Sequence, residues 1–118
     1  MSAQDAGRAV REFYAAYSDG DPGKFDEVVA DDYTDYGHNP PGRGPQGAKN
    51  DFEHAVQVVG GNVKYNIDAL VARDDGNVAV AWTGTLPNGK QSQGLSLYLV
   101  KDAKITETRH AAIGALPS

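Results

Sequence analysis

Residues 31–47 read DDYTDYGHNPPGRGPQG, and this stretch separates two parts of the chain that have different hydrophobic periods. Its prolines at positions 40, 41 and 45 fix φ and remove backbone donors. Its glycines at positions 37, 42, 44 and 47 allow backbone conformations that other residues avoid. We therefore expect no regular element to run through the stretch. A segment this polar should lie at the surface or at the mouth of a pocket.

Helical periodicity precedes this stretch and resumes at its end. Apolar residues recur at the spacing of an amphipathic helix from Ala3 to Ser18, where Ser2 or Asp5 can cap the start. The Ser18-Asp19-Gly20 segment should end that helix. The other predicted helices are a short one that starts at Asp21-Pro22, with Asp as N-cap, and one that runs from Pro45 to the Gly60-Gly61 stop.

After Gly61 the apolar residues alternate with polar ones, as in strands that are buried on one face. The Asn88-Gly89 pair is a strong hairpin signal. The predicted strands are Val63–Val71, Val78–Leu86, Gln91–Val100 and Ile105 to about Ile113, with a short additional strand at Tyr33–Tyr36. Helices followed by an antiparallel meander predict an α+β fold with segregated layers. A strongly bent sheet with three helices on its concave side would enclose a pocket.

Composition limits the classes of function. A chain of 118 residues suits a single domain spanning residues 1–118. The absence of cysteine excludes disulfides, thiolate metal sites and cysteine nucleophiles. A net charge of −5 with scattered basic residues argues against nucleic acid as a partner. The N-terminus has no apolar signal region and no run is long enough to span a bilayer, so we expect a cytoplasmic protein with no membrane partner.

Aromatic residues on the presumed inner surfaces can form the wall of a pocket for a small molecule. The alternative is that they only fill the core, which is the usual role of an aromatic stripe. The predicted wall residues are Phe13, Tyr17, Phe52, Trp82 and Tyr98.

The chain has three histidines. His38 follows Asp35 by three positions, and a carboxylate at that distance can orient a general base; the alternative is an exposed loop histidine. His110 faces either the pocket or the solvent, depending on the face of the last strand. His54, in the middle of a helix, is interpreted as a surface residue. Because no two histidines lie four residues apart, no metal site is expected.

The segment Gly42–Gly47, GRGPQG, matches the glycine spacing of dinucleotide-binding loops. That motif requires a preceding buried strand and a following parallel strand. Here a proline-rich segment precedes it and an antiparallel meander follows. Dinucleotide binding is therefore not expected, although the helix start after Pro45 can hold an anionic group of a substrate.

Four segments in order carry a resemblance to a known family. They are FYAAYSDGD (13–21), VADDYTDYGHNPP (29–41) with GPQG, VAVAWTG (78–84) and GLSLYLVKDAKITETRH (94–110). Through them the chain resembles the SnoaL-like branch of the NTF2-like superfamily, which includes polyketide cyclases, ketosteroid isomerases and limonene epoxide hydrolases. The resemblance implies a cone-shaped α+β fold with a deep apolar pocket, homodimers, and acid–base catalysis without a cofactor.

The chain departs from that family at the positions of its acids. By the resemblance, the isomerase tyrosine falls at Phe13, its general-base aspartate at Gly37 and its second acid near Ser96. The aspartate that ends the last strand in cyclases and epoxide hydrolases falls near Ile113. The histidine of the cyclase-like HNPP motif corresponds to His38.

These observations lead to one functional hypothesis and one alternative. The hypothesis is a cofactor-independent acid–base enzyme, of isomerase or cyclase type, that acts on a small and largely apolar carbonyl or polyketide-like compound. In it His38 removes a proton, and Tyr17, Ser96, Tyr98 or His110 stabilises the oxyanion. The alternative is a non-catalytic protein that binds a small molecule or serves as a dimeric accessory subunit.

A homodimer is expected from the strands themselves. Residues Val63–Val71 and Gly94–Val100 place apolar side chains on both faces of the sheet. Helices can cover only one of those faces, so a second copy of the chain should cover the other.

Overall fold

The computed structural model describes residues 2–37 and 40–115, so that His38 lies outside the described residues. The helices are α1 (Ala3–Asp19), the 3₁₀ helix η1 (Pro22–Lys24), α2 (Phe25–Val28) and α3 (Gly44–Val59). The strands are β1 (Val29–Asp35), β2 (Gly42–Arg43), β3 (Lys64–Ala72), β4 (Asn77–Thr85), β5 (Gln91–Lys101) and β6 (Lys104–Ala115). The predicted α+β class is confirmed.

Helix α1 matches the first predicted helix and has both of its predicted ends. The Ser2 hydroxyl accepts a hydrogen bond from the Asp5 amide at 3.1 Å, which satisfies a donor of the first turn. Gly20 ends the helix with φ of 67°, a left-handed conformation that glycine adopts without strain. The buried stripe of the helix consists of Ala6, Gly7, Ala9, Val10, Phe13, Tyr14 and Ala16.

The second predicted helix is divided into η1 and α2. Pro22 lies in its first turn as predicted. Asp21 occupies the N-cap position, but its side chain makes no capping hydrogen bond to any described residue. Phe25 and Val28 are buried. Packing against the core, and not a capping hydrogen bond, therefore stabilises this short segment.

The stretch at residues 31–47 contains more regular structure than its prolines and glycines predict. Strand β1 extends into it as far as Asp35, and α3 begins within it at Gly44. The strand forms because its backbone pairs with β6 on one side and with β2 on the other. The chain leaves regular structure at Tyr36 and Gly37, which form a turn.

The strands form one six-stranded sheet in the order β2-β1-β6-β5-β4-β3. The predicted antiparallel meander of β3 to β6 is confirmed. Strand β1 pairs parallel to β6, so the complete sheet is mixed. Helix α3 makes this possible, since it carries the chain from the β1 edge to β3 at the opposite edge.

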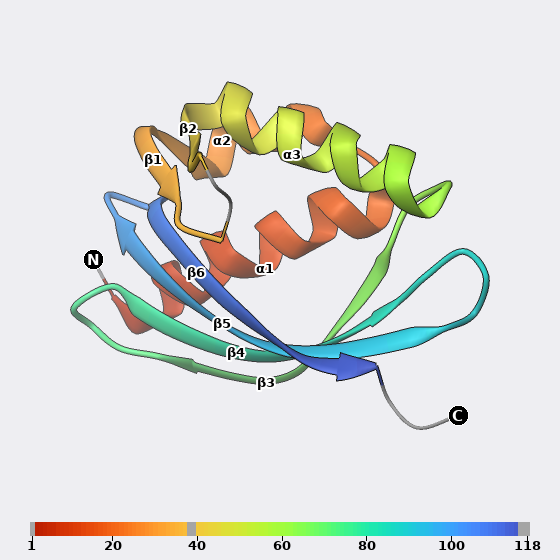
Figure 1. The fold of residues 1–118 in the computed structure, drawn as a ribbon. Coiled ribbons are helices and arrows are strands. Elements are labelled where there is room, and N and C mark those ends of the chain that lie inside the picture. The colour runs from red at the N-terminus through yellow and green to blue at the C-terminus, as the bar shows by residue number, and fades with distance from the viewer. Residues whose placement is uncertain (1, 38–39, 116–118) are drawn as a thin grey trace.

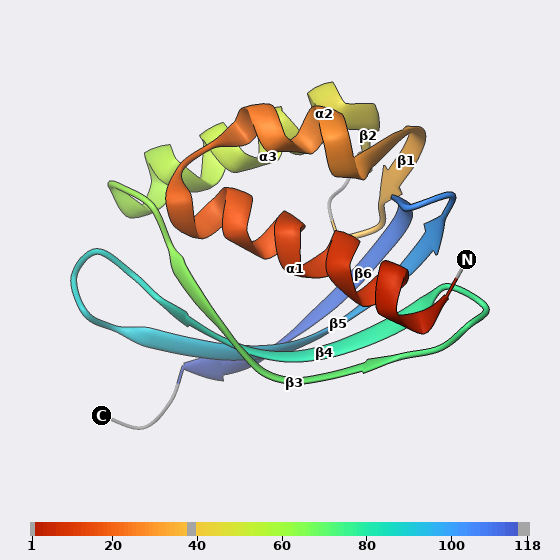
Figure 2. The same cartoon turned by 180° about the vertical axis from the view of Figure 1, so that it is seen from behind.

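The sheet bends around the helices, which lie together on its concave side (Figures 1 and 2). Helix α1 packs against β3 to β6, while α3 packs against β1 and β2. The largest fully buried side chains of this core include Tyr33, Tyr98, Phe25 and Ile105. The opposite face of the sheet carries no described helix. None of the described helices has the length and apolar character needed to cross a membrane.

Candidate active site

A cavity of about 410 Å³ lies between the helices and the concave face of the sheet. Its lining residues are Phe13, Tyr14, Tyr17, Asp35, Gly37, Asp51, Ala55, Tyr65, Trp82, Ser96, Tyr98, His110 and Ala112. Cavities of this size suit small molecules. The lining includes Asp35, His110 and Ser96, together with four of the five predicted wall residues. The fifth, Phe52, packs behind the wall, with its ring centroid 5.4 Å from that of Tyr17.

Trp82 forms part of the wall because a glycine faces it across the sheet. Gly94 pairs with Trp82 in the register of β4 and β5. A Cβ atom at Gly94 would lie 2.1 Å from Cζ2 of the indole, so any side chain there would displace the ring. The indole also packs edge-to-face on Tyr65, with centroids 5.4 Å apart.

The polar end of the cavity brings Asp35 and His110 together. Nε2 of His110 lies 3.4 Å from Oδ1 of Asp35. Asp35 pairs with Thr108 in the parallel register of β1 and β6, so that His110, on the same face two residues later, lies just beyond the end of β1. Asp35 is only 4% exposed. The sequence suggested His38 as the partner of Asp35, and His38 is outside the described residues.

Gly37 makes room for this contact. Its amide donates a hydrogen bond of 2.7 Å to Oδ1 of Asp35. A Cβ atom at Gly37 would lie 2.3 Å from Cδ2 and 2.6 Å from Nε2 of His110. By the resemblance, this is the position at which isomerases carry their aspartate. Glycine at that position is therefore what allows the imidazole to approach Asp35.

On the other side of the imidazole, Ser96 contacts His110 and Trp82 contacts Ser96. Oγ of Ser96 lies 3.3 Å from Nδ1 of His110, and the Trp82 indole donates to Oγ at 2.9 Å. An ionised carboxylate only accepts hydrogen bonds, so in the neutral imidazole Nε2 carries the hydrogen and faces Asp35. Nδ1 is then the acceptor, and the Ser96 hydroxyl donates to it.

Two tyrosines present hydroxyl groups near Ser96. The Tyr98 hydroxyl donates a hydrogen bond of 2.7 Å to the Tyr14 hydroxyl. Burial raises the pKa of Tyr14 to about 12, against a smaller lowering by its hydrogen bonds with Tyr98 and Ser96. Burial also raises the pKa of Tyr98 well above its ordinary value. Both phenols therefore keep their protons at neutral pH and act as hydrogen-bond donors.

Sequence reasoning missed several residues of this site. Tyr14 belongs to the buried stripe of α1, where an aromatic residue is expected only to fill the core. Asp51, on α3, lines the cavity and raises the pKa of Tyr17, although burial is the larger cause of that shift. Tyr65 alternates with polar neighbours on β3, a pattern that could have placed it on the inner face.

Two further points concern His54 and the possibility of a metal site. His54 is exposed on α3, which confirms its interpretation as a surface residue. Within residues 2–37 and 40–115, no group of three or more histidine, aspartate or glutamate side chains could hold a metal ion.

Solved structures with low sequence identity share this fold. A protein of unknown function with a cystatin-like fold from Methylobium petroleophilum has a TM-score of 0.82 and 20% identity, over 100% of this chain and 82% of that one. An NTF2-like protein of unknown function from Mesorhizobium loti has a TM-score of 0.75 and 19% identity, over 95% and 93%. A candidate ketosteroid isomerase from Kribbella flavida has a TM-score of 0.76 and 15% identity, over 98% and 83%.

No curated protein matches the chain in sequence. A family model described as the SnoaL-like domain matches residues 10–108, which is most of the chain. The match covers α1 from Val10 onward, the polar stretch around Gly37 and the meander as far as Thr108. The three-helix, mixed-sheet architecture agrees with the NTF2-like and cystatin-like structures. The chain belongs to the family of SnoaL-like domains.

Proposed function

We propose that the chain is a cofactor-independent acid–base enzyme, of isomerase or cyclase type, for a small and largely apolar carbonyl or polyketide-like compound. The observation that supports this most strongly is the contact between His110 and the buried Asp35 at one end of an aromatic cavity. Histidine is the side chain best suited to general-base catalysis near neutral pH. A carboxylate behind it fixes its orientation and stabilises its charged form.

The basic atom in this proposal is Nδ1 of His110. Because Nε2 faces Asp35, Nδ1 carries the lone pair, and it takes a proton from the carbon next to the substrate carbonyl. Return of that proton to a different carbon gives an isomer. Attack of the enolate carbon on a second carbonyl gives a ring. Asp35 stabilises the imidazolium in both reactions.

Tyr14 is the proposed donor to the developing enolate oxygen. Its hydroxyl accepts a hydrogen bond from Tyr98, which polarises its own O–H toward the cavity. Preorganised donors of this kind usually contribute the largest part of the stabilisation of an oxyanion. Tyr14 thus takes the role that the sequence assigned to Tyr17, Ser96, Tyr98 or His110.

The lining of the cavity supports an apolar substrate with ring character. Six aromatic side chains surround the space: Phe13, Tyr14, Tyr17, Tyr65, Trp82 and Tyr98. Stacking and edge-to-face contacts with such walls favour flat, unsaturated molecules. The similarity to a candidate ketosteroid isomerase supports the same substrate class.

Exchange of hydrogen for deuterium next to the carbonyl of bicyclic and polycyclic ketones, followed by NMR, tests the proposal. His110→Gln keeps hydrogen-bonding capacity but removes the base, so exchange should fall by a factor of about 10² to 10⁴. Asp35→Asn should also slow exchange. His54→Gln, on the surface, is the matched control and should have no effect. Loss of exchange in His38→Gln with exchange intact in His110→Gln would move the base to His38, as the sequence first suggested.

A second candidate function is a non-catalytic small-molecule-binding or dimeric accessory protein. One observation favours it: the positions that carry acids in the isomerases hold Gly37 and Ser96. The same ketone panel separates the two functions. Ligands that raise the melting temperature without any exchange in the wild-type protein would support the binding protein.

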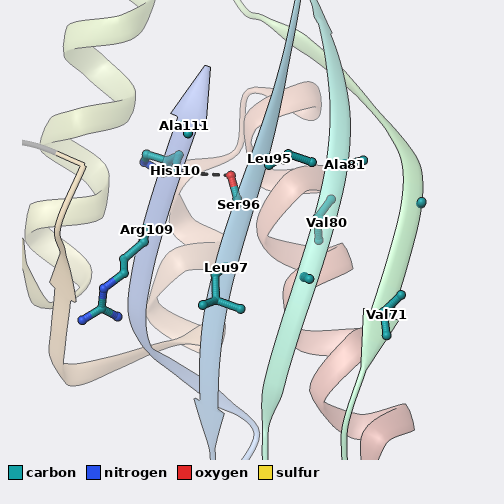
Figure 3. Close-up of a pocket in the computed structure, with 11 residues that line it drawn as sticks. Val71, Val80, Ala81, Leu95, Ser96, Leu97, Arg109, His110 and Ala111 are labelled. Carbon is teal, nitrogen blue, oxygen red and sulfur yellow. Dashed lines mark hydrogen bonds between the residues drawn. The ribbon is translucent and has the colours of Figure 1, made fainter. Parts of the chain in front are cut away.

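We also propose that the chain forms a homodimer, in which two copies pack together through the outer faces of their sheets. That face carries exposed apolar side chains, among them Val71, Leu95 and Leu97 (Figure 3). A shallow hollow of about 520 Å³ lies there, and its lining includes Ala69, Ala79, Ala81 and Ala111. Small residues beside leucines allow a second sheet to approach closely, and monomers rarely expose such a patch.

A further inference from the structure

The hydroxyl of Ser96 lies next to the proposed base, although the proton transfer to and from carbon proposed above does not need a hydroxyl at this position. Its hydroxyl faces a histidine nitrogen, and the other nitrogen of that histidine faces a buried carboxylate. A hydroxyl, a base and an orienting acid in this order are the parts of a nucleophilic serine site. The parts come from three different strands, since Ser96 is on β5, His110 on β6 and Asp35 on β1.

The distances suit this chemistry before a substrate is bound. Oγ of Ser96 is 3.3 Å from Nδ1, and Oδ1 of Asp35 is 3.4 Å from Nε2 of His110. Contacts between nucleophile and base are often looser in the free enzyme than in its complexes. In serine hydrolases the serine faces Nε2 and the acid faces Nδ1. Here Ser96 faces Nδ1 and Asp35 faces Nε2 of His110. This exchange does not prevent catalysis, because each nitrogen of an imidazole can act as the base when the other carries the hydrogen.

Hydrogen-bond donors surround the Ser96 oxygen. The Trp82 indole N–H lies 2.9 Å from Oγ. The hydroxyl groups of Tyr14 and Tyr98 line the same cavity as Ser96. An acyl carbon bonded to Oγ would carry its oxyanion next to these donors, as in an oxyanion hole.

We propose that Ser96 is an acyl-accepting nucleophile and that this cavity hydrolyses esters or thioesters of small apolar acids. Oγ forms a bond to the acyl carbon while its proton moves to Nδ1 of His110, and the carbonyl electron pair moves onto oxygen. When the carbonyl re-forms, the bond to the alcohol oxygen or thiol sulfur breaks, and the leaving group takes the proton from Nδ1. Water then gives its own proton to Nδ1 and attacks the acyl carbon. The acid departs as Ser96 regains its proton.

This activity goes beyond the proposed function, because it uses the same histidine and aspartate for a substrate that need not lose a proton from carbon. The probe is p-nitrophenyl butyrate, which has a short apolar acyl chain and a good leaving group. The wild-type protein should release a burst of p-nitrophenol and gain the mass of one butyryl group on the peptide that contains Ser96. Ser96→Ala should show neither result, and His110→Gln should acylate about 10² to 10⁴ times more slowly.

Ser92→Ala is the matched control, because Ser92 lies on the same strand and does not line the cavity. It should acylate like the wild-type protein. Acylation on a different residue, or equal acylation in Ser96→Ala, would overturn the proposal. So would the complete absence of an acyl-enzyme in folded wild-type protein.

Ser96→Cys gives a second test that does not depend on ester turnover. The chain contains no cysteine, so the new thiol would be its only one. If His110 activates position 96, iodoacetamide should label this thiol at pH values below the ordinary thiol pKa of about 8.5. Adding His110→Gln should then slow labelling at pH 6 to 7 by about tenfold or more. Equal labelling with and without His110 would contradict the proposal.

The two proposals can fail separately. Ketone exchange without acylation in the wild-type protein overturns the nucleophilic serine and leaves the acid–base enzyme in place. Acylation of Ser96 without ketone exchange overturns the acid–base enzyme and leaves the nucleophilic serine in place.

Discussion

Alkaline pH should unfold this protein cooperatively, because its buried phenols keep their protons only while the fold is intact. Burial raises the pKa of Tyr14 from 10.0 to about 12. Burial also raises the pKa values of Tyr17, Tyr33, Tyr65 and Tyr98 above their ordinary value of 10.0.

The sign of the effect follows from which state loses protons first. Above pH 10 the unfolded chain releases its phenolic protons while the folded chain retains them, so stability falls as pH rises. Below pH 10 both states are protonated and stability does not depend on these groups. Each buried phenol contributes about 1.4 kcal/mol per pH unit within its window, so Tyr14 alone accounts for roughly 3 kcal/mol between pH 10 and 12. Small domains have a total stability of about 5–15 kcal/mol, so several such groups together suffice to unfold this one.

Circular dichroism and tyrosinate absorbance, recorded together against pH, measure this effect. Most of the absorbance change should coincide with the loss of secondary structure in one transition above pH 10. Tyr65→Phe should make the transition less steep, while Tyr36→Phe, at an exposed position, serves as control. Stepwise ionisation with an unchanged dichroism spectrum would refute the reasoning, because the phenols would then be accessible to solvent in the folded state.

Three further substitutions test packing, the hydroxyl network and assembly. Trp82→Ala should lower the free energy of unfolding by about 3–5 kcal/mol in denaturant titrations, and a loss within about 0.5 kcal/mol would mean that the indole is not part of the wall. Tyr98→Phe should lower it by about 1–3 kcal/mol, because the Tyr14 hydroxyl loses a buried partner at 2.7 Å; no loss would show that water replaces this bond. Leu97→Lys should convert a dimer into a monomer in sedimentation at micromolar concentration, whereas a wild-type monomer would contradict the proposed dimer.

Local signals in the sequence were sufficient for the meander and the helices. The hairpin that the Asn-Gly pair indicates is present between β4 and β5, and Gly89 has φ of 86°, a left-handed conformation that glycine adopts without strain. Gly20 and Gly60 end their helices in the same region. These features depend on neighbouring residues alone, which is why periodicity and turn residues reveal them.

Long-range pairing was the part that local signals could not predict. Strand β1 exists because β6, far along the chain, pairs with it in parallel register. That pairing also determines which histidine faces Asp35. It places Asp35 opposite Thr108, and His110 follows Thr108 by two residues on the same face of β6. The sequence therefore suggested the nearest histidine, His38. The aromatic wall was easier to predict, because apolar periodicity indicates which side chains face inward.

The most direct test of a cavity that stabilises an enolate is the crystal structure of the protein with a bound polycyclic phenol. A phenol resembles the enol in shape, and its phenolate resembles the enolate in charge, so the ligand oxygen should lie about 2.7–3.1 Å from the Tyr14 hydroxyl, with the ring carbons beside His110. A ligand found in the outer hollow between Leu95 and Leu97, or one in the cavity with its oxygen directed away from Tyr14 and His110, would contradict the proposed chemistry.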